Sequence, residues 1–239
     1  PERCYRPRLS MSEPMPLAVL VSGGGSNLQS LIDSIEAGRV PARIVLVLAN
    51  TPDAYGLVRA EKHGLPTAVV PHTAYPDRES HDRDVVAAIR AAGAEAVVLA
   101  GYMRLLSPFF IQAFPQRILN IHPALLPAFQ GLHGQHQAAE YGVKLAGATV
   151  HFVDEELDNG PIIIQAALPT QEGDDGDTLA QRILHLEHRI YPQAVKWLAE
   201  GRLQIRKRHV VVDNAPDPGP APGSDASVCL FAPGLEPGM

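Results

Sequence analysis

The sequence predicts an α/β fold, in which helices cover both faces of an open, mostly parallel and twisted sheet. Short β-branched runs alternate with amphipathic segments along the chain, as strands and helices do in folds of this class. The runs are apolar at successive positions, which predicts strands buried on both faces. A chain of 239 residues that is 46% hydrophobic is long enough for one such core and short for two.

Five apolar runs are expected to form the strands of the parallel sheet. They are residues 17–21, 44–48, 67–70, 96–99 and 117–121. The segments between them have recognisable helix starts. An apolar stripe follows Ser26, and both Asp77 and Ser80 are candidate caps for a helix. Ser107 is followed by Pro108, which places a proline in the first helical turn.

After the fifth strand the pattern changes. Residues 148–153 and 161–168 predict two further strands. The acidic turn 154–160 joins them, and this short connection indicates an antiparallel extension of the sheet. A helix over about residues 178–198 is expected to close the domain.

Both ends of the chain are expected to be disordered. Residues 1–16 contain four prolines, and residues 213–239 are rich in proline and glycine. A short transit peptide is an alternative for the first segment, but Glu2 and the prolines disfavour its amphipathic helix. The catalytic domain is therefore expected to span residues 17–212.

Composition excludes several classes of protein. A formal net charge of -6 and a pI near 5.9 argue against a nucleic-acid-binding surface. The two cysteines, Cys4 and Cys229, lie in the terminal segments, so a disulfide framework or a cysteine metal cluster is not expected in the core. The apolar runs are too short to cross a membrane, and the N-terminus does not resemble a signal peptide. A cytoplasmic location is expected.

A glycine-rich loop, residues 22–27, lies between the first strand and the first helix, where backbone amides and the helix dipole favour an anion. Gly23 and Gly25 match two glycines of the dinucleotide fingerprint, but Leu28 stands at the third and no acidic residue ends the second strand. The loop also lacks the lysine of a nucleoside-triphosphate loop. A small phosphorylated metabolite is favoured, and glycines that only permit a tight turn are the alternative.

The strongest motif follows the fifth strand. Asn120 and His122 are two residues apart, so they point to the same side, and Pro123 keeps His122 extended. An amide can donate to a developing oxyanion, and a histidine can move the proton that acyl transfer requires. Asp158, in the acidic turn, would favour the imidazolium form of His122. Each residue alone has a structural interpretation, either a packed histidine or a hairpin turn.

These residues resemble the folate-dependent formyltransferase family, in particular its glycinamide ribonucleotide branch. The resemblance covers about residues 17–204. Its motifs are Ser-Gly-x-Gly-Ser-Asn at 22–27, Ala-Gly-Tyr-Met-Arg-Leu-Leu at 100–106, Asn-Ile-His-Pro-x-Leu-Leu-Pro at 120–127, Gly-Ala-Thr-Val-His-Phe-Val at 147–153 and Leu-Asp-x-Gly-Pro at 157–161. It implies a Rossmann-like formyltransferase fold.

The resemblance also implies site residues and a reaction. It places Gly25, Ser26 and Asn27 on the phosphate of glycinamide ribonucleotide, and Glu187 on the same substrate. Beside the folate it places Arg78, Met103, Arg104, Leu105, Leu106, Asn120, Asp154 and Asp158. In the implied reaction of purine (IMP) biosynthesis, the glycinamide amine of N1-(5-phospho-D-ribosyl)glycinamide attacks the formyl carbon of 10-formyltetrahydrofolate. Asn120, His122 and Asp158 are the implied catalytic residues, the partners are the two substrates, and the enzyme is a monomer or homodimer.

No metal, nicotinamide or flavin is expected. His133 and His136 could be metal ligands, but no third ligand stands at a suitable spacing. The chain departs from many relatives at Gln135, where they have a second histidine, so the loop after Pro127 is expected to behave differently as a lid. His151 alternates with apolar neighbours on a strand; the resemblance places it near the site, and a packing role is the alternative.

Three other functions stay open. A methionyl-tRNA formyltransferase would need a further domain after the catalytic one, and a formyltetrahydrofolate deformylase, a hydrolase, would carry a regulatory domain before it. Residues 131–133, Gly-Leu-His, look more like the glycinamide ribonucleotide enzymes. A non-catalytic module that binds a phosphorylated metabolite is the third alternative; it would need only the glycine loop.

Overall fold

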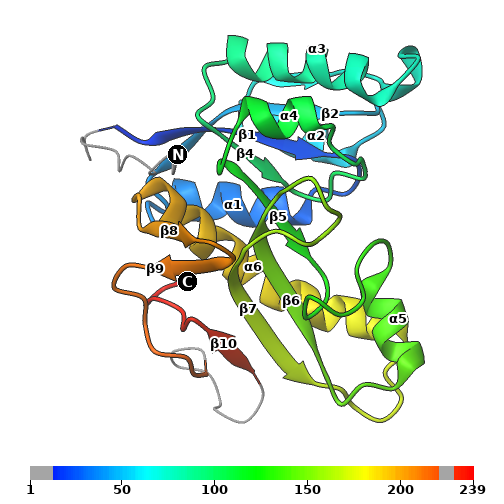
Figure 1. Ribbon diagram of the computed structural model, residues 1–239, viewed down its shortest axis with the longest axis vertical. Coiled ribbons are helices and arrows are strands. Elements are labelled where there is room, and N and C mark those ends of the chain that lie inside the picture. Colours follow the sequence, from blue (N-terminus) through cyan, green and yellow to red (C-terminus); the bar gives the residue numbers. More distant parts are fainter. Residues whose placement is uncertain (1–12, 221–228) are drawn as a thin grey trace.

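An eight-stranded sheet forms the centre of the molecule (Figure 1). The structure, a computed structural model, describes residues 13–220 and 229–239. The strand order is β10-β7-β6-β5-β4-β1-β2-β3. Strands β1 to β5 run parallel, whereas β6, β7 and β10 are antiparallel to their neighbours. The predicted α/β fold, with an antiparallel extension after the fifth strand, is therefore confirmed.

The elements alternate along the chain as the sequence predicts. The strands are β1 (Met15–Val21), β2 (Ala42–Ala49), β3 (Thr67–Val69), β4 (Ala96–Leu99), β5 (Ile118–His122), β6 (Leu145–Phe152), β7 (Ile162–Pro169), β8 (Leu203–Arg206), β9 (His209–Val212) and β10 (Leu230–Ala232). The helices are α1 (Ser26–Glu36), α2 (Tyr55–Lys62), η1 (His72–Ala74, a short 3-10 helix), α3 (Arg78–Ala91), α4 (Pro108–Ala113), α5 (Gly134–Tyr141) and α6 (Gly176–Ala199). Strands β8 and β9 form a separate hairpin.

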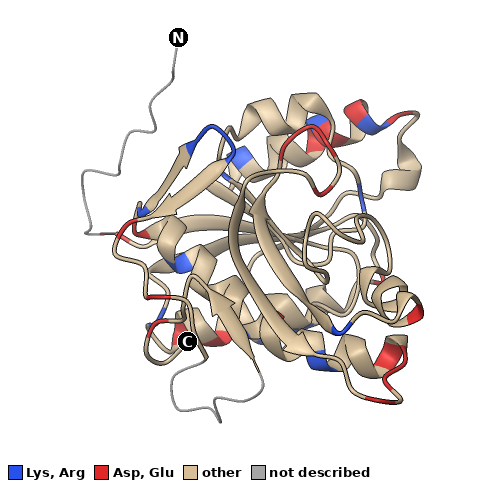
Figure 2. Cartoon of the chain, turned by 60° about the horizontal axis from the view of Figure 1, so that its bottom comes forward, with Lys and Arg blue, Asp and Glu red and all other residues tan. Residues whose placement is uncertain are grey.

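Helices bury both faces of the sheet, as the continuously apolar strands require (Figure 1). On β1, Leu17 and Val19 belong to a core shared with α1 and α6. The alternate residues, Ala18 and Leu20, belong to a second core shared with α3 and α4. Most charged residues stand on the helices and loops, and the strands of the sheet contain few (Figure 2). In the described part of the chain, no helix has both the length and the apolar character that crossing a bilayer requires.

The predicted helix caps are present. The side chain of Asp77 accepts a hydrogen bond from the backbone N–H of Ser80 at the start of α3, and Ser107 accepts from Phe110 N at the start of α4, where Pro108 is the first helical residue. Each bond satisfies a backbone donor that the first turn of a helix leaves without a partner.

The strand order brings the predicted site residues to one edge of the sheet. Parallel strands β1, β4 and β5 are neighbours, so their carboxyl ends meet at one edge of the sheet. The order of the parallel strands reverses between β4 and β1, and ligands of open α/β sheets bind at such a reversal. The glycine-rich loop after β1 and the motif that ends β5 therefore lie along the same edge.

Parts of both end segments are folded into the structure, although disorder was expected there. Residues 1–12 lie outside the described residues, but Met15 is fully buried in β1. In the expected tail, β10 pairs with β7, and Phe231 and Leu235 are buried. Met15 joins the sheet because its N–H donates to Pro41 O at 3.0 Å, and β10 joins because β7 otherwise leaves an open edge. Composition alone does not show either partner.

Candidate active site

A cavity of about 550 Å³ opens at the carboxyl ends of β4 and β5 and reaches the turn after β6. Every residue that the sequence places beside the folate lines it: Arg78, Met103, Arg104, Leu105, Leu106, Asn120, Asp154 and Asp158. Met103 and Leu105 are 64% and 54% exposed, so they present apolar surface to a ligand in the cavity. An apolar lining with a few convergent polar groups suits a ring-bearing organic ligand.

Asn120 and His122 reach the cavity from β5. Both line it, and so does Ile121 between them. The His122 side chain is buried, and its Nε2 lies 2.7 Å from the carbonyl oxygen of Phe129. Its Nδ1 faces Asp158 Oδ2 at 3.4 Å. Both ring nitrogens therefore face acceptors, an arrangement that the two N–H groups of an imidazolium satisfy.

Asp158 reaches the same point from the turn between β6 and β7. Its backbone adopts the left-handed conformation, with a φ of 47°, which is unfavourable for a residue with a side chain. The carboxylate is 8% exposed and accepts from Gly131 N at 2.9 Å. Its carbonyl oxygen accepts from Gln130 Nε2 at 3.2 Å. Two distant parts of the chain thus meet around His122.

His151, whose role the sequence leaves open, lies inside the site. It stands opposite Asn120 in the β5–β6 pair, and its Nε2 is 3.3 Å from Asn120 Nδ2 and 3.7 Å from Asp158 Oδ1. Its Nδ1 lies 2.8 Å from the carbonyl oxygen of Phe152, so this nitrogen donates and Nε2 accepts from the amide. Burial lowers the pKa of His151, which favours this neutral form.

The glycine-rich loop borders the cavity without lining it. Ser22 is the link, because its Oγ accepts from Met103 N at 2.8 Å. Helix α1 starts at Ser26 with Gly25 at its cap and no side chain bonded to its first amides. Gly25 has a φ of 69°, and a Cβ atom there would lie 2.7 Å from Gly56 Cα. Only glycine fits this turn. Because no side chain caps α1, the first backbone amides of the helix can bind an anion.

Glu187 and Asn27, predicted for the same substrate, are in direct contact. Asn27 Nδ2 donates to Glu187 Oε2 at 2.7 Å, although the residues are 160 positions apart. Burial raises the pKa of Glu187 to about 7, against the lowering effect of this hydrogen bond. Asn27 Oδ1 is buried without a hydrogen-bond partner. At the end of the glycine-rich loop, Asn27 Oδ1 can therefore still accept a hydrogen bond from a ligand.

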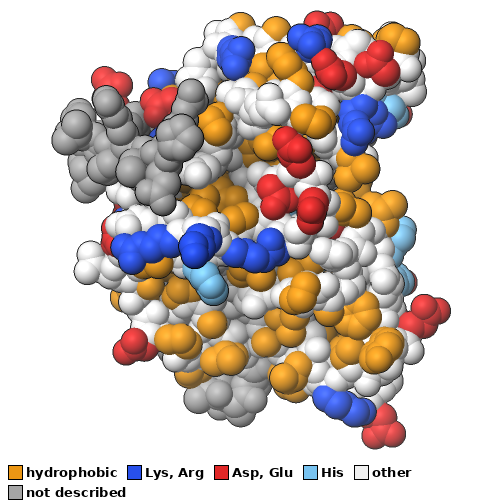
Figure 3. Space-filling model, viewed as in Figure 1, with side chains coloured by type: hydrophobic (Ala, Val, Ile, Leu, Met, Phe, Trp, Pro, Cys, Tyr) orange, Lys and Arg blue, Asp and Glu red, His pale blue; other side chains and the backbone are white. Residues whose placement is uncertain are grey.

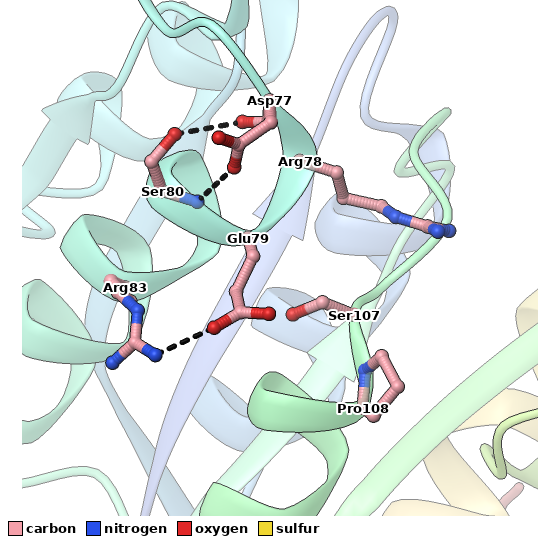
Figure 4. Close-up of a pocket in the computed structure, with 7 residues that line it drawn as sticks. All are labelled: Asp77, Arg78, Glu79, Ser80, Arg83, Ser107 and Pro108. Atoms are coloured by element: carbon pink, nitrogen blue, oxygen red, sulfur yellow. Dashed lines mark hydrogen bonds and ion pairs between the residues drawn. The ribbon is translucent and has the colours of Figure 1, made fainter.

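A second cavity, of about 590 Å³, lies beside the first, at the starts of α3 and α4 (Figure 4). Arg78 lines both cavities. In Figure 4 its guanidinium points away from the ion pair between Arg83 and Glu79, whose atoms are 2.6 Å apart. Arg78 is exposed, so it can contact an anionic group on a ligand that extends out of the first cavity.

The loop after Pro127 also reaches the cavity, which His133 and Gln135 line. Gln135 Oε1 is buried without a hydrogen-bond partner. His136 points elsewhere, with Nε2 at 3.2 Å from Asp177 Oδ1. Within residues 13–220 and 229–239, no group of three or more histidine, cysteine or acidic side chains is placed to hold a metal ion.

Several contacts of the site could not be predicted from the sequence. The acceptor for His122 is a backbone oxygen, at Phe129, and the donor to the Asp158 carboxylate is the backbone amide of Gly131. Backbone groups carry no residue-type signal. For His151 the sequence offered only the family resemblance, which places it near the site, and a polar side chain between Val150 and Phe152.

A fold and a site of this kind define a class of enzyme. The family model described as formyl transferase matches residues 15–195, and the chain belongs to the formyl transferase family.

Individual members of the family are similar to this chain in both sequence and structure. The chain is 42% identical over 199 residues to phosphoribosylglycinamide formyltransferase from Escherichia coli (strain K12), a match that covers 83% of this chain and 94% of that protein. The crystal structure of glycinamide ribonucleotide transformylase 1 from Symbiobacterium toebii superposes with a TM-score of 0.83 at 49% identity, over 84% of this chain and 95% of that one. A formyltetrahydrofolate deformylase from Pseudomonas syringae superposes with a TM-score of 0.79 at 28% identity, over 84% and 67% of the two chains.

Proposed function

We propose that the protein transfers the formyl group of 10-formyltetrahydrofolate to the glycinamide amine of N1-(5-phospho-D-ribosyl)glycinamide in purine biosynthesis, as a cytoplasmic monomer or homodimer. The observation that carries the proposal is the meeting of Asn120, His122 and Asp158 at the wall of one cavity. The two relatives at 42% and 49% identity, whose names specify this substrate, support the choice of acceptor.

The amine attacks the formyl carbon, and the carbonyl oxygen becomes an oxyanion that the protein must stabilise. Asn120 Nδ2 carries two hydrogens. The bond to His151, at 3.3 Å, uses one, and the 3.5 Å separation from Asp158 is too long to hold the other firmly. We assign this second hydrogen to the oxyanion.

His122 supplies the positive charge. Its Nε2–H is occupied by Phe129 O, so Nδ1–H is the group that faces both Asp158 and the reacting atoms. The Asp158 carboxylate favours the imidazolium form, which stabilises the oxyanion and donates a proton as the folate nitrogen leaves. A water bound to the Asp158 carboxylate is proposed to carry the proton that the attacking amine loses back to His122, which restores the imidazolium. No covalent enzyme intermediate is required.

The phosphate of the acceptor is proposed to lie on the amides of Gly25, Ser26 and Asn27, with Glu187 on the same molecule. The uncapped start of α1 supports this assignment, and so does the unused Oδ1 of Asn27. The folate is proposed to fill the cavity, with Arg78 at its outer end and the turn that carries Asp154 and Asp158 beside its ring system.

The test is an assay of purified protein with 10-formyltetrahydrofolate and one acceptor at a time: glycinamide ribonucleotide, formylatable tRNA, or water alone. Folate consumption that depends on the ribonucleotide is expected. Consumption that ignores the ribonucleotide would refute the proposed acceptor and favour a deformylase. If no acceptor supports turnover and Ser26 or Asn27, but not His122, is required for biological activity, the protein is instead a metabolite-binding module.

A further inference from the structure

The turn that carries Asp158 is anchored by a segment that follows the residues matched by the family model. Arg208 donates from Nη2 to two oxygens of Asn159, the backbone carbonyl oxygen at 2.5 Å and Oδ1 at 2.8 Å. Asn159 directly follows Asp158, and its Nδ2 donates to the carboxylate of Glu156. The residue next to the proposed catalytic carboxylate is therefore held through its backbone and through both ends of its amide.

The hairpin that carries Arg208 is itself fixed. Strands β8 and β9 pair with Leu203 opposite Val212 and Ile205 opposite Val210. These four side chains pack against the large hydrophobic core. The turn consists of Lys207 and Arg208 only, because Arg206 already pairs with His209. A two-residue turn on a packed hairpin leaves the Arg208 backbone little freedom. Because the hairpin packs on the core, the guanidinium of Arg208 holds Asn159 in a fixed position relative to the core.

The turn between β6 and β7 requires such support, because Asp158 has a left-handed backbone. Gln130 and Gly131, on the loop after β5, donate to Asp158 itself. Arg208 donates to the next residue from a different element. A strained conformation persists only where its surroundings determine it fully, and removing one of these anchors is expected to let the turn relax.

General electrostatic attraction is a competing explanation. Figure 3 shows a row of Lys and Arg side chains over the β8–β9 hairpin, close to a group of acidic side chains. Such a row could attract an anionic folate or the acidic turn as a whole. Arg206 separates the two explanations. It is exposed like Arg208 and carries the same charge in the same hairpin, but its guanidinium donates to Gln204 of its own strand.

We infer that Arg208 is a positioning residue for the formyl-transfer site, which holds Asn159 so that the Asp158 carboxylate stays directed at His122. The inference rests on the proposed function only for its kinetic consequence. The mechanical part, that Arg208 orders residues 154–160, is independent of the substrate.

The test compares Arg208→Met with Arg206→Met, each of which removes one positive charge. Arg208→Met is expected to lower kcat by about 3- to 10-fold, the loss of one or two charge-assisted hydrogen bonds at an exposed site. The KM for glycinamide ribonucleotide should not change, and the melting temperature should match that of the wild type. Arg208→Lys, which can still donate to one oxygen, should recover part of kcat. Arg206→Met should leave kcat unchanged.

Amide hydrogen exchange of residues 154–160 provides a readout that needs no substrate. Exchange should accelerate in Arg208→Met and stay at the wild-type rate in Arg206→Met. Equal exchange in the two variants would overturn the inference, because Arg208 would then have no specific effect on the turn. An equal loss of kcat in both would overturn it in favour of a general charge effect. If the wild type does not formylate the ribonucleotide, the proposed function fails, and the exchange experiment alone decides whether Arg208 orders the turn.

Discussion

Replacing Asp158 by asparagine removes one negative charge from the site at almost constant volume. The carboxylate oxygen lies 3.4 Å from His122 Nδ1, and the Asp158 side chain is only 8% exposed. At an effective dielectric constant of about 20, two unit charges at this separation attract by about 5 kcal/mol. The asparagine oxygen keeps the bond from Gly131 N and part of the attraction through its dipole, so about half of this energy should be lost.

A loss of about 2.5 kcal/mol from the transition state corresponds to a fall in kcat of about 70-fold. The KM for glycinamide ribonucleotide should change little, because Asp158 lines the cavity and the residues of the glycine-rich loop do not. Steady-state rates at one pH, with each substrate varied in turn, would measure both kcat and KM.

Asp154→Asn is the matched control. Asp154 lines the same cavity on the same turn, but its side chain accepts from Glu156 N at 3.1 Å and has no hydrogen bond to Asn120 or His122. The variant should retain kcat within about 3-fold. A fall in kcat of less than about 3-fold in Asp158→Asn would refute the assigned role of Asp158.

Three further predictions concern stability. Because burial raises the pKa of Glu187 from 4.5 to about 7, the folded state holds a proton that the unfolded chain releases. The free energy of unfolding should therefore fall by about 2.5 kcal/mol more between pH 5 and pH 8 in the wild type than in Glu187→Gln. Gly25→Ala should lower the free energy of unfolding by at least about 2 kcal/mol, because Gly25 has a φ of 69° and an added Cβ would press on Gly56. The same variant should bind glycinamide ribonucleotide more weakly, as measured by calorimetry. Phe231→Ala should cost about 3 kcal/mol in denaturant unfolding, because this residue of the tail is 1% exposed.

Neighbouring residues provide the controls for these variants. Gly24→Ala should be nearly neutral, because a Cβ there meets nothing within 4 Å. Leu230→Ala should cost less than about 1 kcal/mol, since Leu230 is 52% exposed. Parallel pH profiles for the wild type and Glu187→Gln would contradict the raised pKa. A Phe231→Ala variant as stable as Leu230→Ala would contradict the packing of the tail against the sheet.

The fold could be predicted because its signals are local. Continuously apolar runs such as 17–21 and 96–99 indicate buried strands, and Asp77 and Ser107 cap helices within three residues of their own positions. The pairing of β10 with β7 has no such signal. Its three residues stand among prolines and glycines, and they form a strand because the edge of β7 provides backbone partners.

The sequence by itself determined the chemistry that is available: an amide and an imidazole two residues apart at a strand end, a carboxylate in a turn, and a glycine loop before a helix. Only the tertiary structure decided how these groups combine, because each decisive contact crosses a long stretch of chain. It joined Asn27 to Glu187, set Asp158 3.4 Å from His122, placed His151 behind Asn120 and brought Arg208 to Asn159. Local preferences specify strands, turns and caps, whereas contacts between them follow from strand order and from the packing of both faces of the sheet.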